Sequence, residues 1–193
     1  MKWNIYRVLA LILLVPLSIG FGFAFDGTAT AIERATHPRE EAIAPLVKEY
    51  SAQCALPEHI LWATVLTCSD FVSNAVSTDG RVGLMQIKPE TYAFICTEIR
   101  GGEAQDAGLL YEPKTNLLAG AEWLSYLYQR YGVWETAYAA YYAGTDTVDA
   151  WLADESLRTP LGTIREIPDK SCRVFVKDLC DAVEMYAKLY YQS

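Results

Sequence analysis

The chain has 193 residues, about half of them apolar, and a net charge of -8 at neutral pH. This length and composition suffice for one domain with a sizeable core. The acidic balance argues against a nucleic-acid partner, because phosphate backbones are bound by clustered Lys and Arg and the sequence contains no such run. Neutral sugars remain compatible ligands, because they are bound through aromatic faces and hydrogen bonds.

The N-terminal segment predicts export. Lys2 and Arg7 flank the start of an uncharged apolar stretch at 8–25, which indicates a signal peptide or signal anchor within residues 1–31. Residues 29–31 (Ala-Thr-Ala) offer a cleavage site, whereas an apolar stretch of about eighteen residues just suffices to span a membrane. We therefore expect an extracytoplasmic location in the cell envelope, either membrane-anchored or secreted.

The cysteine count is odd in a chain that we interpret as exported, so at least one thiol has no internal partner. Spacing does not determine the pairing, and both free thiols and an internal disulfide remain open. The five positions are Cys54, Cys68, Cys96, Cys172 and Cys180.

The rest of the chain predicts one mostly α-helical domain at 42–193, preceded by a polar linker at 32–41. Apolar residues recur at helical spacing, and Pro and Gly mark the helix ends. The expected helices cover about 42–50, 57–68, 89–100, 116–131, 135–142, 148–152 and 173–190, with a loop or short hairpin at 73–82.

Five short motifs follow one another along this pattern. They are Ala63 to Phe71 with Cys68-Ser69, Gly-Leu-Met-Gln-Ile-Lys-Pro-Glu-Thr at 83–91, Asn116 with Gly120 and Trp123-Leu124, Ala-Tyr-Tyr-Ala-Gly at 140–144, and Ile167-Pro168 before Arg173. In this order and spacing the motifs resemble the soluble lytic transglycosylase (SLT) family, over about residues 50–191.

The resemblance implies a lysozyme-like helical domain, with a small loop or hairpin lining the cleft, behind an N-terminal hydrophobic helix. It also implies cleavage of the MurNAc-GlcNAc bond of peptidoglycan by one carboxyl group. That group protonates the leaving oxygen and then takes a proton from the C6 hydroxyl, which closes a 1,6-anhydro ring. The expected partners are glycan strands, and the membrane through the N-terminal segment. The sequence shows no metal-ligand spacing or nucleotide-binding loop, so no metal or cofactor is expected.

The main departure from the family pattern is Cys68, which occupies the position of the catalytic glutamate. A thiol has a reference pKa near 8.5, which apolar burial raises further, and its side chain is shorter than that of glutamate. Losing a general acid costs about 10² to 10⁴ in rate. Cys68 could instead pack as a small apolar residue or act as a reactive thiol. Since the resemblance implies that the Ile-Pro segment borders the same cleft, a disulfide with Cys172 also stays open.

The remaining candidate substrate contacts come from the matched motifs. The resemblance implies that Ser69 and Ser77 lie at the cleft, although a loop serine also suits a turn. Gln86 could bind sugar hydroxyl or acetamido groups, or be a buried amide that ties the hairpin to a helix. Tyr141 could present its ring and hydroxyl to a sugar, or belong to the core. Tyr142 replaces the asparagine of the family motif, and it either narrows the cleft or offers a stacking face.

Other acids could replace the missing carboxyl. Asp70 lies about 200° around a continuing helix from Cys68. Glu90 suits the first turn of a helix. Glu166, just before Ile167, lies near a position where some family members place a glutamate beside the cleft. The aromatic side chains on the long helix, Trp123, Tyr126 and Tyr128, are expected to pack in the core and on the surface.

Three functions follow from these observations. The leading hypothesis is a peptidoglycan-binding protein of lytic-transglycosylase type with weak or absent turnover. The alternatives are an active murein lytic transglycosylase with a displaced acid, and an envelope scaffold that uses the domain to bind other proteins.

Overall fold

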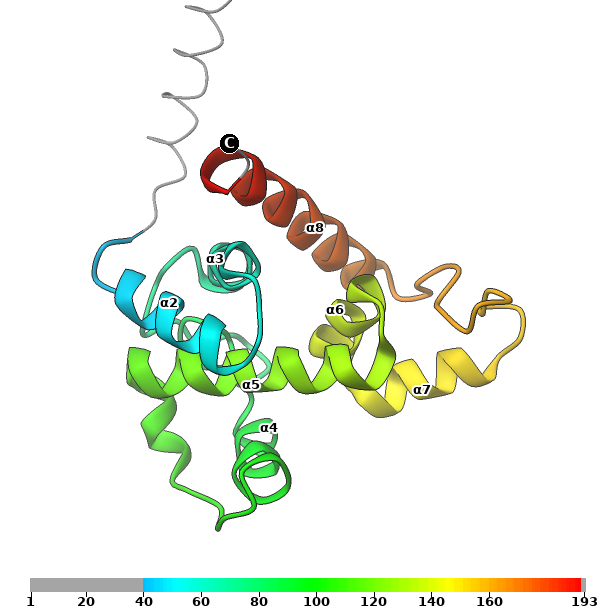
Figure 1. Cartoon of the computed structure of the whole chain (residues 1–193). Coiled ribbons are helices and arrows are strands. Elements are labelled where there is room, and N and C mark those ends of the chain that lie inside the picture. The colour runs from blue at the N-terminus through cyan, green and yellow to red at the C-terminus, as the bar shows by residue number, and fades with distance from the viewer. Residues whose placement is uncertain (1–39, 192–193) are drawn as a thin grey trace, which may run out of the picture. The chain divides into compact units, whose positions relative to one another are not determined.

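Helix α5 (Pro113–Tyr131) runs through the middle of the part of the chain described by the computed structural model, residues 40–191 (Figure 1). Proline in the first turn suits a helix start, since its missing N–H would have no partner there. At the other end Gly132 adopts a left-handed conformation with φ 70°, which glycine reaches without steric cost. Helices α2 (Ala44–Gln53) and α6 (Trp134–Ala143) both pack against α5.

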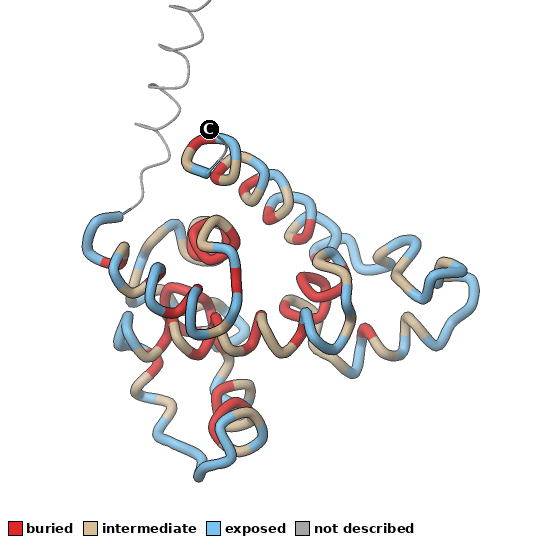
Figure 2. Tube along the Cα trace, viewed as in Figure 1, coloured by how far each residue is buried: buried red, intermediate tan, exposed pale blue. Residues whose placement is uncertain are grey.

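The other helices confirm the mostly α-helical prediction. They are α3 (Glu58–Ser69), α4 (Pro89–Phe94), the π-helical turn η1 (Ile95–Ile99), the 3-10 helix η2 (Ala107–Tyr111), α7 (Thr145–Ala153) and α8 (Lys170–Tyr190). Residues 40–191 contain no strand, only isolated antiparallel bridges such as Val82 with Ile87. Buried residues concentrate in α3, α5 and α6, whereas the segment 153–170 is largely exposed (Figure 2).

Helix α8 closes the domain over α3 and α6. Its N-cap is Asp169, whose carboxylate accepts a 2.6 Å hydrogen bond from the Cys172 amide, and this satisfies a donor that the helix leaves free. Val176, Leu179 and Tyr186 are buried, at the spacing that places apolar side chains on one helical face. This face packs on the core, while the rest of α8 faces water.

The predicted loop or hairpin between α3 and α4 is confirmed. Helix α3 ends where Asp70 and Phe71 both take positive φ values, 48° and 62°, so the chain leaves the helix sharply. The loop then forms bridges between Val76 and Val82 and between Val82 and Ile87. Residues 82–87 are buried, and they anchor the loop in the core beside α5.

The predicted signal segment at 1–31 and most of the linker at 32–41 lie outside the described residues. Within residues 40–191, none of the helices has the length and apolar character that a membrane crossing requires. All five cysteines lie in this region, and each is a free thiol. The structure therefore does not support the disulfide between Cys68 and Cys172 that the sequence left open.

Candidate functional site

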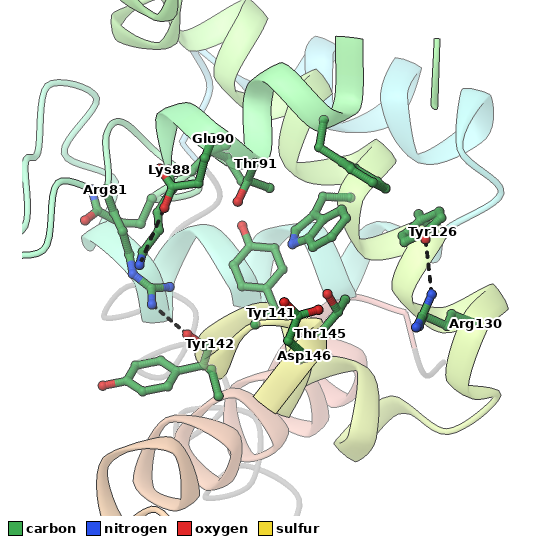
Figure 3. A pocket seen from close by; sticks show the side chains of 17 residues that line it. Arg81, Lys88, Glu90, Thr91, Tyr126, Arg130, Tyr141, Tyr142, Thr145 and Asp146 are labelled. Atoms are coloured by element: carbon green, nitrogen blue, oxygen red, sulfur yellow. Dashed lines mark hydrogen bonds and ion pairs between the residues drawn. The ribbon is translucent and has the colours of Figure 1, made fainter. Parts of the chain in front are cut away.

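A groove of about 440 Å³ lies where the loop before α4 meets α4, α5 and the end of α6. Tyr141 stands in its middle, with Arg81 and Tyr142 toward one end and Tyr126 and Arg130 toward the other (Figure 3). Its lining consists of Arg81, Gln86, Ile87, Lys88, Glu90, Thr91, Phe94, Trp123, Tyr126, Arg130, Tyr141, Tyr142 and residues 140 and 143–146. The predicted site residues Gln86, Tyr141 and Tyr142 are thus brought together.

Ser77 organises the loop rather than the groove wall. Its hydroxyl donates to the Asp79 carboxylate at 2.5 Å and accepts from the Arg81 amide at 2.9 Å. Asp79 also accepts from Nε of Arg81 at 2.9 Å. The hydrogen bond from Ser77 and then the bond and charge of Arg81 lower the pKa of Asp79 to about 2. Ser77 does not line the groove, and its visible role is to build this turn.

Arg81 crosses from the loop to the end of α6, a connection that the sequence did not reveal. Its Nη2 donates a 2.6 Å hydrogen bond to the carbonyl oxygen of Tyr142, and its guanidinium lies 5.0 Å from the centre of the Tyr142 ring. Only 14% of the side chain is exposed. Two hydrogen bonds and a cation–π contact therefore fix the Arg81 guanidinium at the edge of the groove.

Asn116 holds the Gly-Leu-Met-Gln segment against α5. Its buried side chain accepts from the Met85 amide at 2.7 Å and donates to the carbonyls of Val82 and Leu110 at 2.7 and 2.9 Å. Gly83 lies so close that an added Cβ would stand 2.2 Å from Nδ2 of Asn116. This contact explains why both residues occur in the motifs, because any side chain at position 83 would displace the Asn116 amide from its hydrogen-bond partners.

Gln86 adopts φ 49° and is 8% exposed. Its side-chain amide donates to the carbonyls of Ala75 and Gly83 at 3.1 and 2.9 Å, which is the structural role that the sequence allowed. With both amide protons used, Oε1 is the atom left to accept a hydrogen bond from a ligand. Since Gln86 also lines the groove, the structural and ligand-binding roles are compatible.

Tyr141 joins α6 to the same segment. Its hydroxyl donates a 2.5 Å hydrogen bond to the carbonyl of Met85. Burial, and after it the neighbouring Cys68, raises the pKa of Tyr141 far above its ordinary value. The hydroxyl therefore stays protonated, as a donor, across the whole physiological range.

Cys68 lies in the last turn of α3, beside this cluster. Its neighbour Ser69 donates to the carbonyl of Leu84 at 2.8 Å, so the helix end is tied to the Gly-Leu-Met-Gln segment. Burial raises the pKa of the Cys68 thiol to about 12, against the opposing effect of the Arg81 charge. Cys68 itself does not line the groove.

The profile of the Transglycosylase SLT domain family matches residues 45–159, which include α3, the loop, α5 and α6. This match covers more than half of the chain. The chain belongs to the Transglycosylase SLT domain family.

Relatives of this SLT domain include much longer proteins. It is 29% identical to the soluble lytic murein transglycosylase of Escherichia coli (strain K12) over 138 residues, 69% of this chain and 21% of that protein. It is 32% identical to the membrane-bound lytic murein transglycosylase C of Yersinia pestis (strain Pestoides F) over 88 residues, 45% of this chain and 25% of that protein.

Solved structures agree with this assignment. The 70 kDa soluble lytic transglycosylase of Escherichia coli superimposes with a TM-score of 0.72 at 26% identity, over 83% of this chain and 26% of that one. An inactive variant of the lytic transglycosylase Slt of Pseudomonas aeruginosa, with glutamine replacing one glutamate, gives a TM-score of 0.64 at 27% identity, over 76% and 24% of the two chains. This chain thus spans about a quarter of these structures.

The carboxyl groups that could replace the missing acid are exposed to solvent. Asp70 is exposed and ends α3, and Glu90 is exposed on the groove rim, 3.8 Å from Lys88. Asp146 is a second exposed carboxyl on the rim. Glu166 lies in a separate cavity beside α8, where it pairs with Arg173 at 3.4 Å. The structure therefore does not bring Glu166 together with the other predicted site residues.

An aromatic cluster forms the α5 side of the groove. Trp123 and Tyr126 stack with ring centres 5.3 Å apart, and Phe94 from α4 meets both edge-on at 5.7 and 5.5 Å. All three line the groove, whereas the sequence suggested packing roles alone for Trp123 and Tyr126. Aromatic surfaces of this kind suit the apolar faces of sugar rings. Among residues 40–191, no group of three or more His, Cys, Asp or Glu side chains is arranged to hold a metal ion.

Proposed function

We propose that this protein binds glycan strands of peptidoglycan in the groove of its SLT domain, in the cell envelope, and turns them over very weakly or not at all. Its relatives are named as murein transglycosylases, soluble or membrane-bound. The groove offers what an amino-sugar chain needs: an aromatic side formed by Phe94, Trp123 and Tyr126, and polar groups from Gln86 and Tyr141.

The proposal of weak or absent turnover rests on the thiol at position 68. A general acid must release its proton near neutral pH, whereas burial raises the pKa of Cys68 to about 12. Near neutral pH the thiol therefore keeps its proton, whereas a carboxyl with a raised pKa could donate its proton at the same pH. In the Pseudomonas relative, a variant with one glutamate changed to glutamine is described as inactive, which shows how strongly that protein depends on one carboxyl.

Glycan binding is tested with the full chain, in detergent micelles if the N-terminal segment is retained, and with purified sacculi. We expect the protein to sediment with sacculi, and soluble chitotetraose to compete with this binding. A Gln86→Ala variant serves as the groove variant and should sediment less. An exposed amide on α5 provides the matched control, Gln129→Ala, and its sedimentation should equal that of the native chain. Absence of sedimentation of the native protein would favour the scaffold alternative.

Turnover is tested on the same sacculi by mass spectrometry of the soluble fraction. We expect no 1,6-anhydromuropeptides above a protein-free control. Their release by the native chain would support the alternative, an active transglycosylase that uses a displaced acid. Glu90 and Asp146 are the carboxyls on the groove rim, so Glu90→Gln and Asp146→Asn would then identify the acid.

A further inference from the structure

The Arg81 guanidinium lies at one end of the groove and keeps hydrogen-bond donors that the protein does not use. Nε donates to the Asp79 carboxylate at 2.9 Å and Nη2 to the Tyr142 carbonyl at 2.6 Å, while Nη1 donates to no residue in 40–191. Since a guanidinium carries five N–H groups, three of them are left for a ligand. Arg81 lines the groove beside Tyr142 (Figure 3).

This guanidinium is also held in place. It lies 5.0 Å from the centre of the Tyr142 ring, and Phe175 of α8 contacts the same ring with centres 4.9 Å apart. The planar donor array of arginine matches a carboxylate, and a side chain that is already fixed loses little conformational entropy when it binds one. Arg81 is thus preorganised to bind a planar anion.

We propose that Arg81 binds a carboxylate of the glycan strand, so that the groove prefers strands with negatively charged muramic acid residues over neutral strands. The inference rests on the proposed function and names a specificity determinant of the same groove. N-acetylmuramic acid differs from N-acetylglucosamine by a lactyl ether. This ether ends in a carboxylate, or in a stem peptide that carries carboxylates of its own, and both sources offer Arg81 the same chemistry.

Arg81 is the best placed of the three groove cations for this role. Arg130 is 42% exposed and pairs with Asp149 at 2.5 Å, and Lys88 is 35% exposed and lies 3.8 Å from Asp79. Only 14% of the Arg81 side chain is exposed, and a charge-assisted hydrogen bond is stronger where less water surrounds it.

The remaining charges do not replace this contact. The chain carries a net charge of -8, which repels an anionic polymer, so that a local cation is needed to hold one. Asp79 neutralises part of the Arg81 charge. However, it is 49% exposed, so water screens it, and its bond to Nε leaves the Nη1 protons free for a ligand.

The test compares charged ligands with a neutral copy, by isothermal titration calorimetry of the full chain in detergent micelles. One charged probe is the peptide-free tetrasaccharide of alternating N-acetylglucosamine and N-acetylmuramic acid, and the other is the same tetrasaccharide with its stem peptides. In the neutral probe the lactyl carboxylates are converted to methylamides. We expect a charged probe to bind about tenfold more tightly than the neutral one at low salt, and the ratio to shrink as salt is added.

The probes also separate the two sources of the carboxylate. A preference for the peptide-free probe assigns the contact to the lactyl group, and a preference for the peptide-bearing probe alone assigns it to the peptide. Equal dissociation constants for all three probes overturn the proposal. This comparison uses the native chain, so it does not depend on the folding of any variant.

Arg81→Gln should remove the preference and leave the affinity for the neutral probe unchanged. Glutamine is neutral and keeps a donor for the Tyr142 carbonyl. The matched control is Arg130→Gln, which removes the other groove arginine and should retain the preference. An equal fall in affinity for charged and neutral probes in Arg81→Gln would assign Arg81 a structural role and overturn the proposal. The same loss of preference in Arg130→Gln would also overturn it. Arg81→Met replaces Arg81→Gln if circular dichroism shows that the latter is unfolded.

The proposed function is tested separately by sacculi and chitotetraose, which is neutral. A native chain that binds both, but shows no preference for charged probes, retains the proposed function and overturns only the role of Arg81. A native chain that binds none of these ligands overturns both.

Discussion

The Tyr141 hydroxyl and the Met85 carbonyl oxygen lie 2.5 Å apart, joined by a hydrogen bond across 56 residues of sequence. This bond connects α6 to the segment that carries Gln86, so it couples two sides of the groove. A buried carbonyl that loses its donor contributes a desolvation cost of about 1–3 kcal/mol.

Tyr141→Phe should therefore lower the free energy of unfolding by about 1–3 kcal/mol and weaken chitotetraose binding. Urea unfolding and fluorescence titration measure the two effects. The adjacent Tyr142→Phe is the control, because its hydroxyl has no hydrogen bond to residues 40–191 and its ring contacts with Phe175 and Arg81 remain. An equal loss of stability in both variants would contradict the role assigned to Tyr141.

Asn116→Ala should be the most damaging of the polar substitutions. It leaves the Met85 amide and the Val82 and Leu110 carbonyls without the side chain that satisfies them, and each unpaired buried group costs about 1–3 kcal/mol. We expect a fall of at least about 3 kcal/mol in the free energy of unfolding. Gln129→Ala, on the exposed side of the same helix, should stay within about 0.5 kcal/mol.

Gly120→Ala tests the close packing of α5 on the Gly-Leu-Met-Gln segment. A Cβ at this position would lie 2.6 Å from atoms of the Met85 side chain, and overpacking a core typically costs about 1–3 kcal/mol. Because Met85 precedes Gln86, glycan affinity should fall as well. At Gly102 the nearest atom would be the Cys96 carbonyl oxygen at 3.5 Å, an ordinary contact, so thermal unfolding of Gly102→Ala should match that of the native chain.

The thiols should make the protein sensitive to alkali. Burial raises the pKa of Cys68 and Cys172 to about 12, and that of Cys54 and Cys180 to about 11, whereas an unfolded cysteine titrates near 8.5. The folded state thus holds these protons more tightly. The resulting stabilisation is complete below about pH 8.5 and declines as the pH rises toward 11–12.

Urea unfolding at about pH 7, 9 and 10.5 measures this decline, in conditions where cysteine titration is expected. The Cys68→Ala variant should lose less stability over that range than the native chain does, because one of the four perturbed thiols is gone. Tyrosine ionisation is common to both proteins and cancels in the difference. An identical pH dependence would show that the Cys68 thiol titrates normally in the folded state.

Local sequence patterns predicted the helices well, because helix ends depend on neighbouring residues. Proline in the first turn of α4 and glycine after α6 placed these boundaries within a few residues. The predicted start of α5, near residue 116, lies after the observed start at Pro113. The first turn of this helix carries few apolar side chains, so it shows no helical period. The 3-10 helix η2 (Ala107–Tyr111) was not predicted, because its length is too short for periodicity.

The motifs also located most of the groove. Gln86, Tyr141 and Tyr142 were singled out by position, and all three line it. Arg81 was missed because its partner lies 61 residues away, and no rule of spacing predicts such a contact. The contribution of the aromatic cluster to the groove was not predicted for the same reason. Phe94 and Trp123 come from different helices, and only their packing brings the rings together.

By itself, the sequence determined the helical domain, the order of the family motifs and the presence of a thiol at position 68, since these depend on local propensity and on residue identity. Tertiary structure decided which groups line the groove. It brought the Arg81 guanidinium to the Tyr142 carbonyl and left Glu166 in another cavity, because distances between groups far apart along the chain are set by packing.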